Sequence, residues 1–156
     1  MKNEFQIYLA GGMQGLSFDE MNEWRSRFKE KLIRYANAIS PNSKLIVVNP
    51  CDYYNFEKKE YRTQREVMEY DLHRVRTSQL IVVDFTHKPV SIGTAMELAV
   101  AREHNIPIIG VCTADWENSN DNPINHLHPW QKECCTRLCE SYEELENYIK
   151  KFFLFE

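Results

Sequence analysis

The apolar residues of the chain gather in four short runs, separated by longer segments in which apolar positions recur at helical spacing. The runs are 5–10, 44–49, 79–85 and 106–111, and in each of them aliphatic residues follow one another with little polar alternation. This pattern is typical of strands that are covered on both faces, as in parallel sheets. We therefore predict four buried parallel strands.

The segments between the runs predict helices. Ser17 and Glu20 form a capping-box signature, and the apolar positions that follow at helical spacing are Phe18, Met21, Trp24, Phe28 and Leu32. Further helices are predicted over 63–77, 94–104 and 143–155. Strands that alternate with helices predict an α/β fold with right-handed crossovers, a Rossmann-like doubly wound parallel sheet sandwiched by helices.

The length of the chain fits a single domain over residues 1–156. Within it, the segment 112–140 has no hydrophobic periodicity. A segment of that length in a compact domain is typical of a lid or a partner-binding arm. We therefore expect a long irregular segment there, followed by the C-terminal helix.

Composition narrows the classes of function. The chain is 43% hydrophobic and 27% charged, as in globular proteins, and its net charge of -4 argues against a nucleic-acid polymer as partner. No apolar stretch reaches the roughly 18 residues of a membrane-spanning helix, so no membrane partner is expected. The five cysteines are an odd number, and the N-terminal segment lacks a signal-peptide pattern, which together favour a reducing, cytoplasmic location.

Two carboxylates interrupt faces that packing alone would make apolar. Glu97 lies within the run SIGTAMELAVA, and Asp71 shares the predicted inward face of its helix with Met68, Leu72 and Val75. Each acid could serve a structural network. Together they fit cleavage of a glycosidic bond, in which one carboxylate attacks the sugar carbon and a second orients the substrate or carries a proton. Glu97 near its helix N-terminus is expected to stay ionised, which suits a nucleophile.

Three stretches should meet at the carboxyl edge of the sheet, where ligands bind in open parallel sheets. One is Tyr8 with the glycine turn, a second is Asp84 after its strand, and a third is the turn that opens the helix of Glu97. We expect substrate contacts from Gly11, Gly12, Asp84, Ser91, Gly93 and Thr94. Asp84 could instead cap the turn that follows its strand.

The motifs IYLAGGMQG, YDLHRV, LIVVDFT and SIGTAMELAVA resemble the nucleoside 2-deoxyribosyltransferase superfamily, which includes the 2'-deoxynucleoside 5'-phosphate N-hydrolases. The resemblance spans about residues 5–111. It implies an α/β sandwich, a homodimer or larger homo-oligomer with sites near subunit contacts, a small nucleoside or nucleotide as substrate, and neither cofactor nor metal.

Carried over by position, the resemblance assigns the nucleophile to Glu97, the neighbouring tyrosine to Tyr8 and the second acid to Asp71. Gly93 and Thr94 match the turn before the nucleophile helix. The transferases commonly carry an aspartate where this chain has Ser91. A serine there resembles the nucleotide hydrolases, and a hydroxyl tolerates a phosphate dianion that a carboxylate would repel. This difference favours a 5'-monophosphate substrate.

Other interpretations remain open. The pair His126 and His128 with the cysteines of 134–139 could suggest zinc, but adjacent cysteines do not match the usual ligand spacing. A Gly-Thr-x-x-Glu turn also occurs in lysine-decarboxylase-like phosphoribohydrolases, whose preceding Pro-Gly-Gly is missing here. The tyrosines of 51–61 could stack on a base or pack a subunit interface. A nucleotide-binding sensor without turnover is the alternative to an enzyme.

Overall fold

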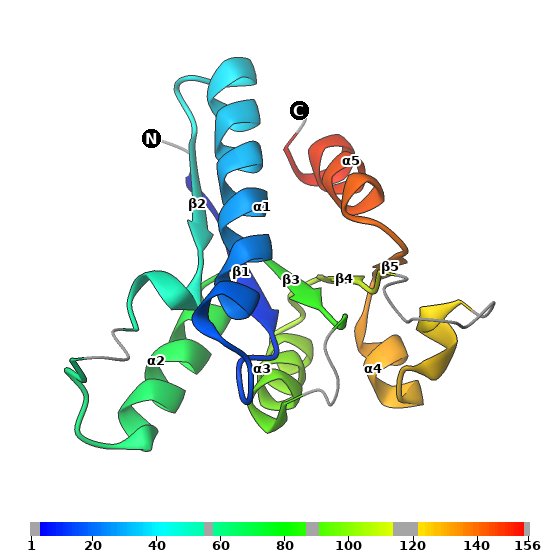
Figure 1. Cartoon of the computed structure of the whole chain (residues 1–156). Coiled ribbons are helices and arrows are strands. Elements are labelled where there is room, and N and C mark those ends of the chain that lie inside the picture. Colours follow the sequence, from blue (N-terminus) through cyan, green and yellow to red (C-terminus); the bar gives the residue numbers. More distant parts are fainter. Residues whose placement is uncertain (1–3, 55–57, 87–90, 114–121, 155–156) are drawn as a thin grey trace.

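The computed structural model describes residues 4–54, 58–86, 91–113 and 122–154, and its centre is a five-stranded, entirely parallel sheet (Figure 1). The strands are β1 (Glu4–Gly11), β2 (Lys44–Val48), β3 (Leu80–Asp84), β4 (Ile108–Val111) and β5 (Arg137–Cys139). Their order in the sheet is β2-β1-β3-β4-β5. The four predicted strands are confirmed. The sequence pattern missed β5, because three residues are too few to show a periodicity.

The helices begin at polar caps that are visible in the sequence. They are α1 (Phe18–Ile39), α2 (Gln64–Arg76), α3 (Ile92–Glu103), α4 (Pro129–Cys134) and α5 (Tyr142–Phe153), with the 3-10 turns η1 (Pro50–Asp52) and η2 (Pro123–His126). The capping box of Ser17 and Glu20 starts α1 as predicted. Ser91 caps α3, which therefore starts two residues earlier than its apolar pattern indicates.

Helices cover both faces of the sheet, which confirms the predicted sandwich. On one face α1 and α5 pack on a buried cluster that includes Ile7 and Leu9 of β1. On the other face α2 and α3 pack on a second cluster that includes Tyr8 and Ala10 (Figure 1). Because side chains alternate along a strand, neighbouring residues of β1 serve opposite layers. Tyr8 therefore faces the layer that carries both candidate acids.

The segment 112–140 is more ordered than its sequence pattern indicates. Its described part contains η2, α4 and β5, and β5 extends the sheet by pairing with β4. Leu127 and Cys139 are buried in the two core clusters. Residues 114–121 lie outside the described residues, as do 155 and 156 at the end of the predicted C-terminal helix. Among the described helices, none combines the length and the apolar character needed to cross a membrane.

Candidate active site

Tyr8 and Glu97 meet across the interface between β1 and α3. The Tyr8 phenol, which is fully buried, donates a hydrogen bond of 2.7 Å to Oε1 of Glu97. Glu97 is the sixth residue of α3, and its neighbour Leu98 packs in the core. The structure thus brings together the strand tyrosine and the acid that the sequence analysis selects.

Asp71 has its own phenol partner. Tyr53, which ends η1 just after β2, donates a hydrogen bond of 2.7 Å from its hydroxyl to Oδ1 of Asp71 on α2. Leu72 and Val75 of α2 are buried as predicted, whereas Met68 is 38% exposed, so the predicted inward stripe is wrong at Met68. Met68 lies in the N-terminal half of α2, whereas the buried residues of this helix lie in its C-terminal half.

Burial governs the ionisation of both acids. Burial raises the pKa of Glu97 to about 8; the negative Asp71 adds to this rise, while the Tyr8 hydrogen bond and the positive Arg25 oppose it. Burial also raises the pKa of Asp71, against the phenol hydrogen bonds of the surrounding tyrosines. Both carboxyl groups are therefore easier to protonate than in water.

The expectation that the helix dipole keeps Glu97 ionised is therefore not met. Because α3 begins at Ile92, Glu97 lies in the second turn, and the effect of the dipole falls off within the first turn. Desolvation is the larger influence at this depth.

The tyrosines at the site act as hydrogen-bond donors. Burial, followed by the nearby carboxylates, raises the pKa of Tyr8 well above its usual value. The same two causes raise the pKa of Tyr53. Each phenol therefore stays neutral at physiological pH and presents an O–H to a carboxylate. The site consists of two phenol–carboxyl pairs that are linked through charge, since the negative Asp71 raises the pKa of Glu97.

The two glycines after β1 have different reasons to be glycine. Gly11 has a φ of 154°, and a Cβ there would lie 3.2 Å from Nη2 of Arg25 and 3.3 Å from both Trp24 and the Asp84 carbonyl oxygen. Gly11 is therefore required by packing within the protein. A Cβ on Gly12 would meet nothing within 4 Å, so the space beside Gly12 is open. Of the two predicted glycine contacts, Gly12 has the room for a ligand.

Asp84 uses both of its oxygens within the protein. Oδ1 accepts the backbone N–H of Thr86 at 2.7 Å, and Oδ2 accepts the phenol of Tyr142 at 2.5 Å. The carboxylate thus caps the turn after β3 and ties this turn to the start of α5. This is the capping role that the sequence left open; a substrate contact of Asp84 stays a prediction.

Ser91, Gly93 and Thr94 form the N-terminal turn of α3. The Ser91 Oγ accepts the Thr94 N–H at 3.1 Å and lies 2.9 Å from the Thr94 hydroxyl. Thr94 is buried, whereas Gly93 is exposed and a Cβ there would meet only Ser91, at 3.9 Å. Helical geometry separates Ser91 from Glu97 by about 9 Å along the axis, so this turn lies near the candidate nucleophile.

Sequence reasoning did not single out Tyr53 or Arg25. The tyrosines of 51–61 carry no periodicity that would pair one of them with Asp71, because the partner comes from another element. Arg25 did leave a signal. It falls four residues after Met21 and three before Phe28, within the apolar stripe of α1, and the structure buries all three. Like Asp71 and Glu97, a charged residue in such a stripe marks a charge on a face that the fold buries.

The cysteines and histidines of the segment 126–139 make contacts within the protein. Burial raises the pKa of Cys135 to about 12 and that of Cys139 to about 11, so both are thiols at neutral pH. His128 caps α4 by accepting the Trp130 N–H at its Nδ1, and Asn122 caps η2. Over the described ranges, no group of three or more His, Cys, Asp or Glu side chains could hold a metal ion.

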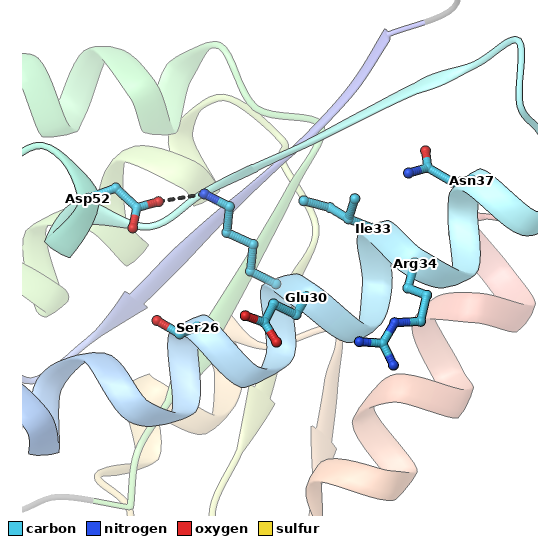
Figure 2. Close-up of a pocket in the computed structure, with 7 residues that line it drawn as sticks. Ser26, Glu30, Ile33, Arg34, Asn37 and Asp52 are labelled. Carbon is cyan, nitrogen blue, oxygen red and sulfur yellow. Dashed lines mark hydrogen bonds and ion pairs between the residues drawn. The ribbon is translucent and has the colours of Figure 1, made fainter.

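A cavity of about 530 Å³ lies elsewhere, along α1 beside η1 (Figure 2). Figure 2 shows Ser26, Glu30, Arg34 and Asn37 on successive turns of α1, with Asp52 beside them. Lys29, which also lines the cavity, forms an ion pair of 2.5 Å with Asp52. None of the catalytic candidates lines this cavity. The candidate active site is therefore the pair of phenol–carboxyl contacts and not this cavity.

Comparisons with known proteins identify one family from the sequence and one shared fold among solved structures. The family model described as nucleoside 2-deoxyribosyltransferase matches residues 7–143. A search of curated protein sequences finds no match. A conserved protein from Enterococcus faecalis V583 has a TM-score of 0.67 at 20% identity, covering 95% of this chain and 98% of that one.

Two solved structures with described activities share this fold. A 2-deoxyribosyltransferase from Bacillus psychrosaccharolyticus has a TM-score of 0.65 at 16% identity, with 92% and 91% of the two chains covered. The Clostridium botulinum CMP N-glycosidase BcmB has a TM-score of 0.54 at 14% identity, with 95% and 99% covered. At these identities the likeness concerns the fold.

Proposed function

Because the chain belongs to the nucleoside 2-deoxyribosyltransferase family, we propose that it cleaves the N-glycosidic bond of a nucleoside or a nucleoside 5'-monophosphate. Glu97 is the proposed nucleophile. The observation that carries the proposal is the 2.7 Å hydrogen bond from Tyr8 to Glu97, beside a second acid, Asp71, that is held in the same way by Tyr53. Buried acids with perturbed pKa values are typical of functional sites.

In the first step the Glu97 carboxylate attacks the anomeric carbon of the sugar. The bond from that carbon to the base nitrogen breaks, its electron pair leaves with the base, and an ester forms between sugar and Glu97. Tyr8 holds Oε1, which directs Oε2 to the sugar carbon. Asp71, whose pKa is raised by burial, holds the sugar hydroxyls or supplies a proton to the departing base.

In the second step an acceptor attacks the same carbon and releases the Glu97 carboxylate. The acceptor is water in a hydrolase and a second base in a transferase, and the proton that it loses returns to the Asp71 carboxylate that protonated the departing base. In both cases the Tyr8 phenol keeps its proton, because its raised pKa makes it a poor acid, and it stabilises the returning carboxylate by its hydrogen bond. The proposed chemistry requires no cofactor.

The substrate that we favour is a 5'-monophosphate. Its phosphate would bind at the start of α3, where the N-terminal backbone amides favour an anion and Ser91 contributes an uncharged hydroxyl. Gly93 is open on its outer side, which lets a ligand approach the backbone closely. The fold of this chain is also that of a CMP N-glycosidase, which supports a nucleotide as substrate.

The test is a chromatographic assay for free base with a panel of nucleosides, deoxynucleosides and their 5'-monophosphates, each with and without a second base. Release of base from monophosphates in water would support the hydrolase form of the proposal. Exchange only in the presence of a second base would indicate a transferase. The Glu97→Gln variant, which keeps the shape of the side chain, should lose turnover in either case, and full activity of this variant would refute the mechanism. Nucleotide binding without any base release would favour the sensor.

We also propose that the protein works as a homodimer or larger homo-oligomer. Ile92 and Trp130 are each 79% exposed, and Met96 is 40% exposed, on helices that pack next to one another. Exposed apolar side chains that gather on one side are typical of subunit contacts. Because Ile92 directly follows Ser91, such a contact would lie beside the active site.

A further inference from the structure

Arg25 is a fully buried charge in the second turn of α1. Its guanidinium donates from Nη2 to the Gly11 carbonyl at 3.0 Å, from Nε to the Leu9 carbonyl at 3.4 Å, and from Nη1 to the Met21 carbonyl. Through the described part of the chain, Arg25 makes no ion pair with a carboxylate. Its hydrogen bonds are satisfied, but carbonyl oxygens are dipoles and do not neutralise the charge.

A buried charge without a counter-charge is costly, and the cost falls when an opposite charge lies nearby in the same low-dielectric region. Besides the Cys51 thiol and the Tyr142 phenol, the groups whose titration responds to Arg25 are the acids Glu97 and Asp71. These are the two candidate catalytic acids, which reach the same region from α3 and α2. The charge of Arg25 therefore favours the ionised form of the carboxylates at the site.

Arg25 also holds the end of β1. Gly11, the last residue of that strand, has a φ of 154°, and a Cβ there would lie 3.2 Å from Nη2 of Arg25. Tyr8 lies three residues earlier on the same strand, and its phenol sets the orientation of Glu97. A shift of the strand end would thus move the phenol that orients the nucleophile.

We propose that Arg25 is a positioning residue for the reaction proposed above: it fixes the carboxyl end of β1 and, through that strand, the Tyr8 phenol that orients Glu97. The role rests on the proposed function of Glu97. Arg25 does not contact substrate in this scheme, because its donors are directed at backbone carbonyls.

The titration of Glu97 supports this role. The groups that act on it are Tyr8 from β1, Asp71 from α2 and Arg25 from α1, and burial is the largest influence. Burial and Asp71 raise the pKa of Glu97, whereas Tyr8 and Arg25 lower it. Removal of the Arg25 charge should therefore raise the pKa further, so that less of the nucleophile is ionised at a given pH.

The experiment compares two variants. Arg25→Gln loses the charge and keeps one amide donor group, whereas Arg25→Lys keeps the charge and loses the planar set of guanidinium donors. Arg27→Gln is the matched control, because Arg27 lies on the same helix with its side chain 65% exposed. Carboxyl-carbon NMR follows the titration of Glu97 in the free protein, with Glu97→Gln used for assignment. Circular dichroism verifies folding.

In Arg25→Gln the pKa of Glu97 should rise by about one unit, and the acid limb of kcat/KM should move to higher pH by the same amount. Arg25→Lys should keep the wild-type titration while kcat falls about tenfold, since the compact ammonium lacks the planar spread of donors with which three guanidinium nitrogens hold three carbonyls. Arg27→Gln should change neither.

A folded Arg25→Gln variant with an unshifted Glu97 would overturn the proposal. If Arg25→Gln does not fold, Arg25→Lys still decides, because wild-type kcat and KM in that variant would contradict the positioning role. The NMR titration needs no turnover. A wild-type protein that releases no base would therefore refute the proposed function, while the effect of Arg25 on Glu97 is measured independently.

Discussion

The hydroxyl of Tyr53 lies 2.7 Å from Oδ1 of Asp71, and the two residues come from segments that follow β2 and precede β3. In the sheet, β1 lies between these two strands. The second acid of the site is thus oriented by a residue from a different segment of the chain. The relation between Tyr53 and Asp71 makes the role of Asp71 testable without replacing the acid.

Tyr53→Phe should lower kcat/KM by roughly tenfold or more, because a hydrogen bond to a charged group contributes about 1.5–3 kcal/mol. The loss of this bond also raises the pKa of Asp71, since the phenol favours the carboxylate form. Steady-state kinetics of base release measure the effect. Tyr70→Phe is the control, because Tyr70 lies on α2 next to Asp71 and is 46% exposed. An equal loss in both variants would contradict a specific role of Tyr53.

The pH dependence of activity should follow the ionisation of Glu97. Because the pKa of this group is raised to about 8, the fraction of ionised nucleophile, and with it kcat/KM, should fall about tenfold per pH unit well below that value. Tyr8→Phe should move this acid limb to still higher pH, since the phenol hydrogen bond lowers the pKa of Glu97. A profile that is flat between pH 6 and 9 would contradict a raised pKa of the nucleophile.

Stability should change with pH through the same group. The folded protein raises the pKa of Glu97 from its usual value of 4.5 to about 8, so the folded state binds the proton more tightly than the unfolded chain. The stability that this contributes is fully present below about pH 4.5 and is lost as the pH rises through about 8.

Glu97→Gln should therefore remove this decline and be more stable than the wild type at pH 9. Thermal unfolding between pH 4.5 and 9 measures both proteins. Glu103→Gln, at the exposed end of α3, serves as the control and should keep the wild-type slope. Parallel pH profiles for the wild type and Glu97→Gln would show that Glu97 titrates normally.

The close packing between β4 and its neighbours predicts a stability effect at Gly110. A Cβ at this position would lie 2.8 Å from both Leu138 and Phe85, so Gly110→Ala should destabilise the fold by about 1–3 kcal/mol. Gly12→Ala is the control, because its Cβ would meet nothing within 4 Å. Urea denaturation gives both free energies of unfolding, and equal values for the two variants would show that the core at Gly110 relaxes freely.

The exposed apolar side chains of α3 predict the assembly state. Sedimentation velocity of the wild type should show a homodimer or larger species, and the double substitution of Ile92→Lys with Met96→Lys should shift it towards monomer, because two buried charges would oppose the contact. Lys150→Glu on α5 is a charge-changing control away from this surface. A monomeric wild type would refute the proposed oligomer.

Features that depend on neighbours along the chain could be predicted from the amino-acid sequence. The aliphatic runs identified four of the five strands, because burial on both faces leaves no polar alternation. The capping box of Ser17 and Glu20 involves residues only three apart, so the start of α1 could be predicted correctly. Asp71 and Glu97 stood out because charge is rare on a face that must be buried.

Contacts between residues far apart in the chain could be known only from the tertiary packing. The strand order β2-β1-β3 brings Tyr53 to Asp71, and the layers of the sandwich bring Tyr142 to Asp84 and Arg25 to the end of β1. The raised pKa of Glu97 likewise arises from burial by several elements at once. Local periodicity records which face of an element is buried, but the identity of the group that it meets there is set by the order in which the elements pack.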